Sequence, residues 1–293
     1  MELKQLRSFV EVVRHGSFTQ AAERLHSTQS TISKQVAQLE QRLGEQLFER
    51  NGPHIRLTDA GKLVLTRAEE MLRLQRELRT ELDDLSQLHR GELRLGLPLL
   101  GGEALLTSLI TRYRQRYPQI IVHLSEGGSK MLEKALLEGE LDLASSLTPS
   151  DPAFDYQPFV DEPLDILLGA SHPLSGRQGL ALEELADSPF LLYQESFALN
   201  DRILLACRQA GFVPREVGRS GQPDLLSALV ASGQGVVLMP RLVARKMERP
   251  GLVRMPLLSP PLRWDLAFVW RRGAYLSRAA KAWLELAGER QPD

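Results

Sequence analysis

The run STQSTISKQ, residues 27–35, leads directly into VAQLEQRLG, residues 36–44. Ile32 is the only apolar residue of the first run, whereas the second has the apolar spacing of an amphipathic helix. One N-cap accounts for one or two hydroxyl groups at a helix start, but not for a run made almost entirely of short hydrogen-bonding side chains. These side chains are therefore candidates for binding something outside the chain.

Two shorter helices are predicted before this stretch. The first has apolar residues at helical spacing from Leu6 to Val13, and the second starts at Ser17 or Thr19. Two short helices, a break of about three residues and a helix with a polar start form the pattern of a helix-turn-helix. We expect the third helix to be anchored by its apolar residues Ile32, Val36, Leu39 and Leu43.

A hairpin or wing is predicted after the third helix, because Leu47-Phe48 and residues 55–57 flank an Asn51-Gly52-Pro53 turn. The resulting winged helix-turn-helix domain is expected to span residues 1–58. Such a motif places the start of its second helix, which is the third helix of this chain, against base edges in the major groove. Gln can pair with adenine, Ser and Thr can bond base edges or phosphates, and Lys suits guanine or phosphate. The predicted DNA contacts are Gln29, Ser30, Thr31, Ser33, Lys34, Arg50 and Arg56.

Each of these assignments has a plainer alternative, in which the hydroxyls only cap the helix and the two arginines lie in a solvated basic loop. The chain has 293 residues, of which 43% are hydrophobic and 25% charged, as in an ordinary globular protein. Its net charge is −1, and residues 1–90 hold 14 Lys and Arg against 13 Asp and Glu. A nucleic-acid surface therefore has to be a local patch. We expect a cytoplasmic protein, because no membrane span or signal peptide is evident and Cys207 is the single cysteine.

One long helix is predicted over residues 59–88, with Thr58 as its N-cap. Its apolar stripe follows a seven-residue repeat. Such a stripe packs either on its own domain or on a second copy of the helix. No neighbouring segment offers an obvious matching stripe, so we expect a dimerisation helix. The stripe comprises Val64, Ala68, Met71, Gln75, Leu78, Leu82 and Leu85.

Residues 91–293 alternate strand and helix patterns, which predicts an α/β domain with largely parallel sheets. The length of this zone and the lack of a repeat indicate two lobes. Lobe I is expected at about residues 91–161 and 266–293, and lobe II at about 162–265. Strands are predicted at 91–98, 120–127, 141–147, 164–170, 190–193, 236–240 and 266–270, and helices at 102–117, 129–139, 199–210, 223–232 and 276–287.

The stretch GSFTQAAERLHSTQSTISKQVAQLEQRLGEQLFERNGPHIRLTDAG, residues 16–61, resembles the N-terminal domain of LysR-type transcriptional regulators. The order of the three zones is also similar to that family, so the resemblance covers the whole chain. One departure is Ser30, where the family often has Pro, which implies an altered sequence preference. The matching positions are the GSFT…AA…L entry, Gln29, Ser33, Leu39-Glu40, Leu43-Gly44, Leu47-Phe48, Arg50 and Leu57-Thr58-x-Ala60-Gly61.

The resemblance implies an α+β multidomain protein with a winged helix-turn-helix, a long linker helix and a two-lobed α/β effector domain like that of periplasmic binding proteins. It implies a homodimer or homotetramer that pairs through the long helix and binds pseudo-palindromic double-stranded DNA. A small organic effector would lie between the lobes and alter DNA bending, and RNA polymerase is a further partner. Neither a cofactor nor a metal ion is expected.

Ligands of open α/β sheets bind beyond the carboxyl ends of strands, near helix N-termini. Backbone N–H groups and a few hydroxyls at these ends suit a small carboxylate. The loop PLLGGEAL, residues 98–105, lacks the Ser or Thr that many relatives place there, which favours a small or rather apolar ligand. The predicted lining consists of Leu99, Leu100, Gly101, Gly128, Ser129, Ser145, Ser146, Thr148, Phe197, Leu199 and Gln222.

The plainer interpretation of these positions is that Gly127-Gly128 forms only a turn and that Ser145 and Ser146 pack beneath the sheet. An enzyme, or a small-molecule-binding α/β domain, fused to a DNA-binding module is the alternative function. The six histidines lack metal-ligand spacing, and the chain contains neither a G-x-S-x-G elbow nor a P-loop. A DNA-architectural protein would need more positive charge. The sequence thus favours a regulator without catalytic residues.

Overall fold

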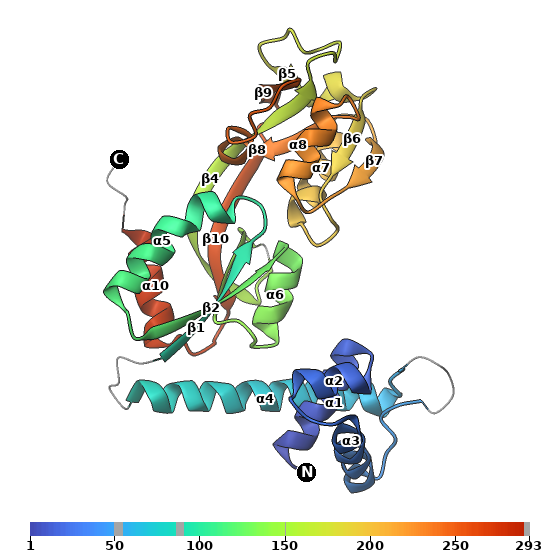
Figure 1. Cartoon of the computed structure of the whole chain (residues 1–293), viewed down its shortest axis with the longest axis vertical. Coiled ribbons are helices and arrows are strands. Elements are labelled where there is room, and N and C mark those ends of the chain that lie inside the picture. The colour runs from blue at the N-terminus through green and yellow to red at the C-terminus, as the bar shows by residue number, and fades with distance from the viewer. Residues whose placement is uncertain (50–54, 86–90, 150, 290–293) are drawn as a thin grey trace. The chain divides into compact units, whose positions relative to one another are not determined.

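The computed structural model describes residues 1–49, 55–85, 91–149 and 151–289, and the chain divides into two compact units at Ser86 and Gln87. The first unit contains three short helices and one long helix (Figure 1). These are α1 (Leu3–His15), α2 (Phe18–Arg24), α3 (Gln29–Leu43) and α4 (Asp59–Leu85).

Local signals in the sequence set the helix ends of the first unit. Ser17 caps α2, where its side chain accepts a hydrogen bond from the backbone N–H of Gln20. Gly16 and Gly44 end α1 and α3 in the left-handed conformation, which glycine adopts without steric cost. Within the core, Phe9 and Phe48 pack with ring centroids 5.3 Å apart.

The anchoring of α3 follows the predicted pattern in three of its four positions. Ile32, Val36 and Leu39 are almost fully buried in the core of the first unit, and each contributes roughly 1.5–3 kcal/mol. The prediction for Leu43 is wrong, because its side chain is 38% exposed. Leu43 is the last residue of α3, and the chain turns away at Gly44.

The start of α4 packs on its own domain. Ala68 and Leu72 are buried in the same core as α1, and Val64 packs against it. The predicted heptad stripe is therefore wrong for Val64 and Ala68, because α1 supplies the partner that the sequence did not reveal. Further along the helix the large apolar side chains are exposed, and the side chain of Leu85 lies outside the described part. The exposed side chains are Met71 (41%), Leu74 (55%), Leu78 (58%) and Leu82 (56%).

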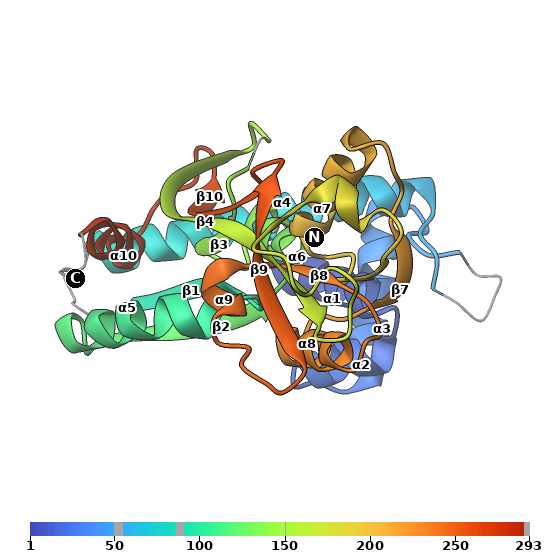
Figure 2. The same cartoon turned by 90° about the horizontal axis from the view of Figure 1, so that it is seen from above.

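The second unit consists of two lobes. Lobe I contains a sheet in the order β2-β1-β3-β10-β4, in which β1 pairs in parallel with β2 and β3. Helices α5 and α10 lie side by side over one face (Figures 1 and 2), and α6 covers the other. The elements are β1 (Gly91–Pro98), α5 (Gly102–Arg116), β2 (Ile120–Gly127), α6 (Ser129–Leu137), β3 (Leu143–Leu147), β10 (Arg263–Arg271) and α10 (Arg278–Gly288).

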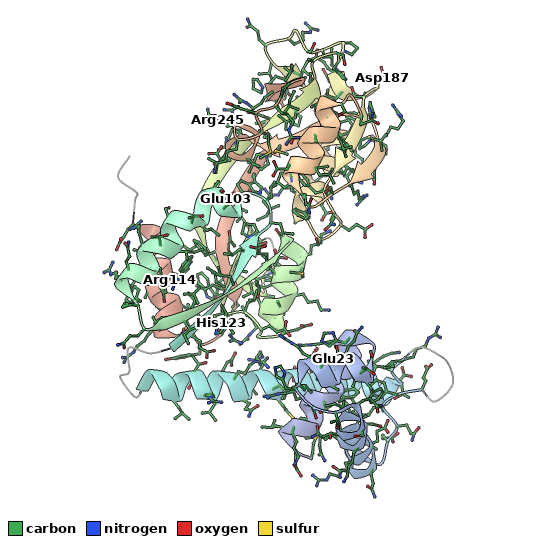
Figure 3. The ribbon with its side chains drawn as sticks, in the orientation of Figure 1. Glu23, Glu103, Arg114, His123, Asp187 and Arg245 are labelled. Atoms are coloured by element: carbon green, nitrogen blue, oxygen red, sulfur yellow. The ribbon has the colours of Figure 1, made fainter. Side chains whose placement is uncertain are left out.

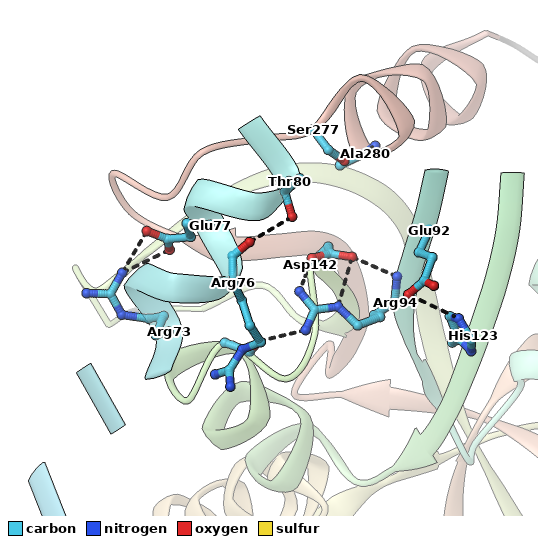
Figure 4. A network of polar contacts seen from close by, with 11 residues as sticks. Arg73, Arg76, Glu77, Thr80, Glu92, Arg94, His123, Asp142, Ser277 and Ala280 are labelled. Carbon is cyan, nitrogen blue, oxygen red and sulfur yellow. Dashed lines mark hydrogen bonds and ion pairs between the residues drawn. The ribbon is translucent and has the colours of Figure 1, made fainter. Parts of the chain in front are cut away.

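A half-buried ion pair joins two strands of lobe I. Arg94 of β1 donates to Asp142, with 2.5 Å between Nη2 and Oδ1, and its backbone N–H donates to the same carboxylate (Figure 4). Arg94 also donates to the carbonyl of Gly139 at 2.9 Å. Because Gly139 and Asp142 both lie between α6 and β3, these bonds fix the turn after α6.

Lobe II contains the remaining elements of the second unit. Its core includes Ile166, Leu168, Phe190 and Leu238. In chain order the elements are β5 (Leu180–Ala181), the 3-10 helix η1 (Leu182–Leu185), β6 (Pro189–Leu192), α7 (Ala198–Gln209), β7 (Arg215–Arg219), α8 (Pro223–Ala231), β8 (Val237–Pro240), α9 (Arg241–Ala244) and β9 (Leu252–Ser259).

One long strand, β4 (Phe154–Gly169), belongs to both lobes. Residues 154–163 pair antiparallel with β10 in lobe I, and residues 164–169 pair antiparallel with β8 and β9 in lobe II. The expectation of largely parallel sheets is therefore wrong, and the sheet is mixed. The chain crosses between the lobes twice, along β4 and β10, and these two crossings run in opposite directions.

Three strands were not predicted from the sequence: β5, which has only two residues, and the longer strands β7 and β9. β7 has four exposed residues out of five and β9 has Pro256 in its interior, so neither has the apolar run of a buried strand. Among the described helices, none combines the length and the apolar character needed to cross a membrane.

Candidate functional site

The polar start of α3 is exposed. Thr28 is the N-cap, and its hydroxyl accepts a hydrogen bond from the backbone N–H of Thr31 at 3.2 Å. The same hydroxyl lies 3.0 Å from that of Ser30 and 2.8 Å from that of Thr31. Gln29, Ser33 and Lys34 have exposed side chains without a hydrogen bond or ion pair to the described residues. Capping therefore uses Thr28, whose hydroxyl also contacts Ser30 and Thr31, and the side chains of Gln29, Ser33 and Lys34 are left to solvent.

Polar contacts hold the inner face of α3 on α1. Ser8 donates to Oε1 of Gln35, and Gln5 donates to Oε1 of Gln38 at 3.3 Å. At 100° per residue, the face opposite Ile32 carries Ser30, Lys34, Ala37 and Gln41, and Thr31 and Ser33 flank it. Gln29 lies about 60° from Ile32 and is exposed because it is the first residue of the helix. Ala37 and Gln41 were not among the predicted DNA contacts. They become candidates only because the structure shows which face of α3 is buried and which is exposed.

The wing is tied to the helices on either side by the residues that matched the LysR pattern. Glu40 accepts hydrogen bonds from the backbone N–H groups of Leu47 at 2.8 Å and Phe48 at 3.4 Å. Phe48 and Leu57 form an antiparallel bridge. Arg56 lies in this wing with an exposed side chain, whereas Arg50 lies outside the described residues.

Thr58 and Gly61 connect the wing to α4. Thr58 caps α4 by accepting from the backbone N–H of Gly61 at 2.9 Å, and its hydroxyl donates to the carbonyl of Gln46 at 2.6 Å. A Cβ at position 61 would lie 2.2 Å from the carbonyl oxygen of Leu47. A glycine is therefore required here for close approach of the wing.

A small apolar cavity lies between the two lobes of the second unit. Its volume is about 20 Å³, which is room for about one water molecule. Apart from the indole N–H of Trp264, Ser129 supplies the only polar side-chain group of the lining. The cavity is lined by Pro98, Leu99, Leu100, Gly127, Gly128, Ser129, Leu147, Phe197, Ala198, Leu199, Trp264 and Leu266.

A direct contact between the lobes keeps this cavity small. The carbonyl of Ser196 in lobe II accepts a hydrogen bond from the backbone N–H of Lys130 in the first turn of α6, at 3.1 Å. Lys130 Nζ also pairs with Asp201 Oδ2 at 2.7 Å. A Cβ on Gly128 would lie 2.4 Å from the Ser196 carbonyl oxygen, so glycine permits the approach. A protein carbonyl thus occupies the helix N-terminus where an anion was predicted.

The lobe II wall of the cavity is held rigidly. Asn200 is buried, and its side chain donates to the carbonyl of Tyr193 at 2.6 Å and accepts from the backbone N–H of Tyr193 at 3.0 Å. The rings of Tyr193 and Phe197 stack with centroids 5.5 Å apart. These contacts fix the loop between β6 and α7 and position Phe197 over the cavity.

Six of the eleven predicted effector contacts lie on the cavity, namely Leu99, Leu100, Gly128, Ser129, Phe197 and Leu199. Gly101 lies just outside, where a Cβ would meet Trp264 at 2.7 Å. Gln222 is the N-cap of α8 and its side chain is exposed. Thr148 contacts the carbonyl of Asp265, with its backbone N–H donating at 2.9 Å.

The two serines of β3 differ in their surroundings. Ser146 donates to Glu133 at 2.6 Å, and burial raises the pKa of that carboxyl above its usual range. Ser146 is therefore committed to α6 and does not line the cavity. Ser145 is fully buried, and its hydroxyl has no hydrogen-bond partner among the described residues. Ser145 shares a strand face with Leu147, which does line the cavity.

Family models match both units of the chain. The model for the "Bacterial regulatory helix-turn-helix protein, lysR family" matches residues 3–62, and the "LysR substrate binding domain" matches residues 86–292. The chain belongs to the LysR family. It is a DNA-binding transcriptional regulator with an effector-binding domain, and because this family consists of regulators, the enzyme alternative is set aside.

The similarity to individual LysR proteins extends over nearly the whole chain. The "Uncharacterized HTH-type transcriptional regulator YwbI" of Bacillus subtilis is 35% identical over 97% of this chain and 95% of its own length. A "Hydrogen peroxide-inducible genes activator" of Pectobacterium carotovorum is 30% identical over 94% of this chain and 92% of its own length. The structure of a full-length OxyR variant from Pseudomonas aeruginosa has a TM-score of 0.70 and 27% identity, and covers 100% of this chain and 99% of that one.

Proposed function

We propose that this LysR-type regulator reads a DNA operator with the exposed face of α3 and responds to a small carboxylate in the cleft between its lobes. The DNA assignment rests on one observation: the polar side chains at the start of α3 have no role inside the described protein beyond one cap. Gln29, Ser30, Thr31, Ser33 and Lys34 would contact base edges and phosphates, with Ala37 suited to a thymine methyl group. Arg56 would contact the DNA backbone from the wing.

An apolar cavity with one polar side chain supports a small ligand with an apolar body. Ser129 and the first backbone N–H groups of α6 would hold its carboxylate, since a helix N-terminus favours an anion. Ser145 would add a hydroxyl, because a buried polar group without a partner is rare in proteins. Trp264, Leu147 and Leu266 would enclose the apolar part.

Ligand entry into this cleft would require the lobes to part. The present volume admits about one water molecule, and the Ser196 carbonyl already occupies the Lys130 N–H group. The carboxylate would replace that carbonyl. The ligand would thus shift the protein from the closed arrangement to a more open one. The size of this shift would be set by the difference between the ligand's affinities for the two arrangements.

Some relatives carry names that indicate a response to hydrogen peroxide, but Cys207 lacks the properties of a peroxide-reactive thiol. It is fully buried within α7, and burial raises its pKa to about 11. The thiolate is the reactive form, and burial in apolar surroundings suppresses it. We therefore infer that this regulator does not sense peroxide through its cysteine.

The exposed apolar side chains of α4 support self-association through that helix. Leu74, Leu78 and Leu82 lie beyond the part of α4 that packs on its own domain. A second α4 would cover them, giving a homodimer that places two α3 helices on the half-sites of a pseudo-palindrome. Pairs of such dimers would form the tetramer. Because its operator is chromosomal DNA, we place the protein in the cytoplasm.

Substitution of Leu78 by Glu tests the assembly. We expect Leu78→Glu to shift the protein toward monomers in sedimentation, because a buried carboxylate in a helix seam is strongly unfavourable. Leu63→Glu is the matched control, since Leu63 is 63% exposed on the same helix but lies before the exposed stripe. An unchanged mass for Leu78→Glu would mean that α4 is not the dimer contact.

The experiment that tests the regulator assignment is fluorescence anisotropy on the DNA just upstream of the protein's own gene. It is measured at several salt concentrations with random DNA as competitor. We expect binding that resists the competitor, because base contacts add discrimination to the salt-dependent phosphate contacts. Failure to bind any DNA at low salt would contradict the assignment of α3.

A further inference from the structure

A groove in lobe II carries a concentration of positive charge. It lies between the end of α9 and the first half of β9, and its volume is about 460 Å³. That volume falls within the usual range for small-molecule sites, and none of its lining residues lines the cavity between the lobes. The residues used below are Arg245, Arg249, Arg254, Met247, Leu252 and Glu248.

The arginines of the groove are incompletely neutralised. The side chain of Arg245 is exposed (Figure 3), and it makes no ion pair or hydrogen bond with the described residues. Arg249 reaches Asp224 at a distance of 3.5 Å, and Asp224 is 80% exposed. The Nε atom of Arg249 is buried without a hydrogen-bond partner in the described part of the protein. Because the Arg249 side chain keeps 31% exposure, the exposed part of its guanidinium is able to donate to an added anion.

The third arginine connects the groove to the strand that both lobes share. Arg254 Nη1 lies 2.6 Å from Oδ2 of Asp165, a fully buried carboxylate on β4. Arg241 contacts the other oxygen of Asp165 at 3.0 Å. One carboxylate therefore faces two guanidinium groups, and this cluster retains an excess positive charge.

The apolar part of the groove is supplied by Met247 and Leu252, which both pack against the core of lobe II. Glu248 is the one carboxylate of the lining, against three arginines. A monovalent anion would leave most of this charge unmatched. A di- or trianion could instead form charge-assisted hydrogen bonds with two or three guanidinium groups at once.

We propose that the lobe II groove is a second ligand site, for a small organic anion that carries two or more negative charges. The anion lies across Arg245, Arg249 and Arg254, and its carbon skeleton contacts Met247 and Leu252. Arg254 is shared between the anion and Asp165. Because Asp165 is two residues beyond the end of the β4 pairing with β10, occupancy of the groove acts on the point where the lobes join.

Calorimetric titration of the full-length protein with citrate, at constant and near-physiological ionic strength, tests this site. Arg245→Glu and Arg249→Gln change the groove. Arg208→Glu is the matched control, because Arg208 is exposed on α7 of the same lobe and does not line the groove. Circular dichroism verifies the folding of each variant, and inorganic phosphate and benzoate serve as further probes.

We expect citrate to bind one site per chain, and each groove variant to weaken that binding at least about tenfold, while Arg208→Glu stays within about twofold. Benzoate should bind much more weakly at this site. Phosphate binding that depends on Arg245 equally supports the site and assigns phosphate as the preferred anion. The proposal is overturned if neither citrate nor phosphate binds, or if Arg245→Glu binds citrate as the wild type does. Neither result would bear on the proposals that α3 reads the operator and that a carboxylate binds in the cleft between the lobes.

Discussion

The outer face of α3 and the cleft between the lobes are both proposed binding sites, but the protein holds them in opposite states. The α3 face is already formed: its polar side chains are exposed and the helix behind them is fixed by Ile32, Val36 and Leu39. The cleft is filled by the protein itself, through Ser196 and Lys130. The proposed DNA contacts therefore need no rearrangement of α3, whereas a ligand in the cleft would have to compete with an internal contact.

The largest effect should come from the preformed face. We expect Gln29→Ala to reduce affinity for the specific operator by roughly 5- to 150-fold, corresponding to about 1–3 kcal/mol of base discrimination. Binding to random DNA should change little. The measurement is anisotropy on both DNAs, with Gln115→Ala, an exposed glutamine of α5, as control. Equal losses on operator and random DNA would assign Gln29 to the DNA backbone.

The self-filled cleft should respond to one added methyl group. Gly128 has φ of −74°, so alanine is permitted there by the backbone, but its Cβ would lie 2.4 Å from the carbonyl oxygen of Ser196 and 2.6 Å from its hydroxyl oxygen. We expect Gly128→Ala to cost about 1–3 kcal/mol and to lower the Tm of the C-terminal unit by roughly 2–12 °C. DNA affinity without ligand should be unchanged.

The control for that variant is Gly176→Ala, because a Cβ at position 176 meets nothing within 4 Å and Gly176 has no positive φ. Calorimetry on the full chain compares the two. If both variants have the same Tm, Ser196 moves aside easily and the cleft is not held shut by this contact. The contrast with the α3 face would then disappear.

A smaller effect is expected from the ion pair across the cleft. Lys130 and Asp201 retain 48% and 61% exposure, so their pair should contribute no more than about 1 kcal/mol. Lys130→Met should therefore raise the exchange rate of the amide at position 130 by at most about fivefold. Lys134→Met, on the same helix but paired with Glu138 of its own lobe, is the control in the hydrogen-exchange measurement. A larger increase in the exchange rate would mean that the ion pair, and not the Ser196 hydrogen bond, mainly holds the lobes together at this point.

The smallest effect is expected from peroxide. With a pKa of about 11, roughly one Cys207 in a thousand is a thiolate at pH 8, so hydrogen peroxide should leave Cys207 as a free thiol and should not alter the DNA affinity. The ordinary pKa of 9.0 in the unfolded chain lies below the folded value, so the unfolded state ionises first. The contribution of Cys207 to the free energy of unfolding should accordingly fall as pH rises from 9 towards 11. Oxidation of the folded protein at pH 7 would contradict both expectations.

Sequence patterns predicted best where one helix face carries the information. The burial of Ile32, Val36 and Leu39 and the cap at Thr58 follow from local spacing and local hydrogen bonding. The prediction that the heptad stripe contacts a second chain was wrong at Ala68, which packs in the core of its own unit. Periodicity shows that a helix face is apolar, but it does not show which segment covers that face. The same ambiguity leaves Leu43 apolar in pattern but exposed at the end of its helix.

The cleft was less accessible to sequence reasoning, because its walls come from distant segments. Trp264 and Leu266 belong to β10, which lies beside β3 only because the chain returns from lobe II. Ser146 was placed in the lining by its position, but Glu133 on α6 takes its hydroxyl. A hydrogen bond such as that between Ser146 and Glu133 depends on how distant segments pack. The sequence could therefore show which strand ends lie near the cleft, but not which of their side chains line it. The predicted DNA-contacting residues and cleft residues remain predictions until they are tested by substitution.

The strand β4 runs unbroken from one lobe into the other, and this continuity has a mechanical consequence. A pair of antiparallel strands resists stretching, because elongation would break its ladder of hydrogen bonds, but it twists readily. The β4–β10 ribbon also contains a bulge, with Phe159 as the extra residue opposite the Leu266–Ala267 step, and bulges increase local twist. The lobes should thus part at the cleft by rotation about the ribbon rather than by stretching it, and a small torsion there would be magnified with distance from the axis.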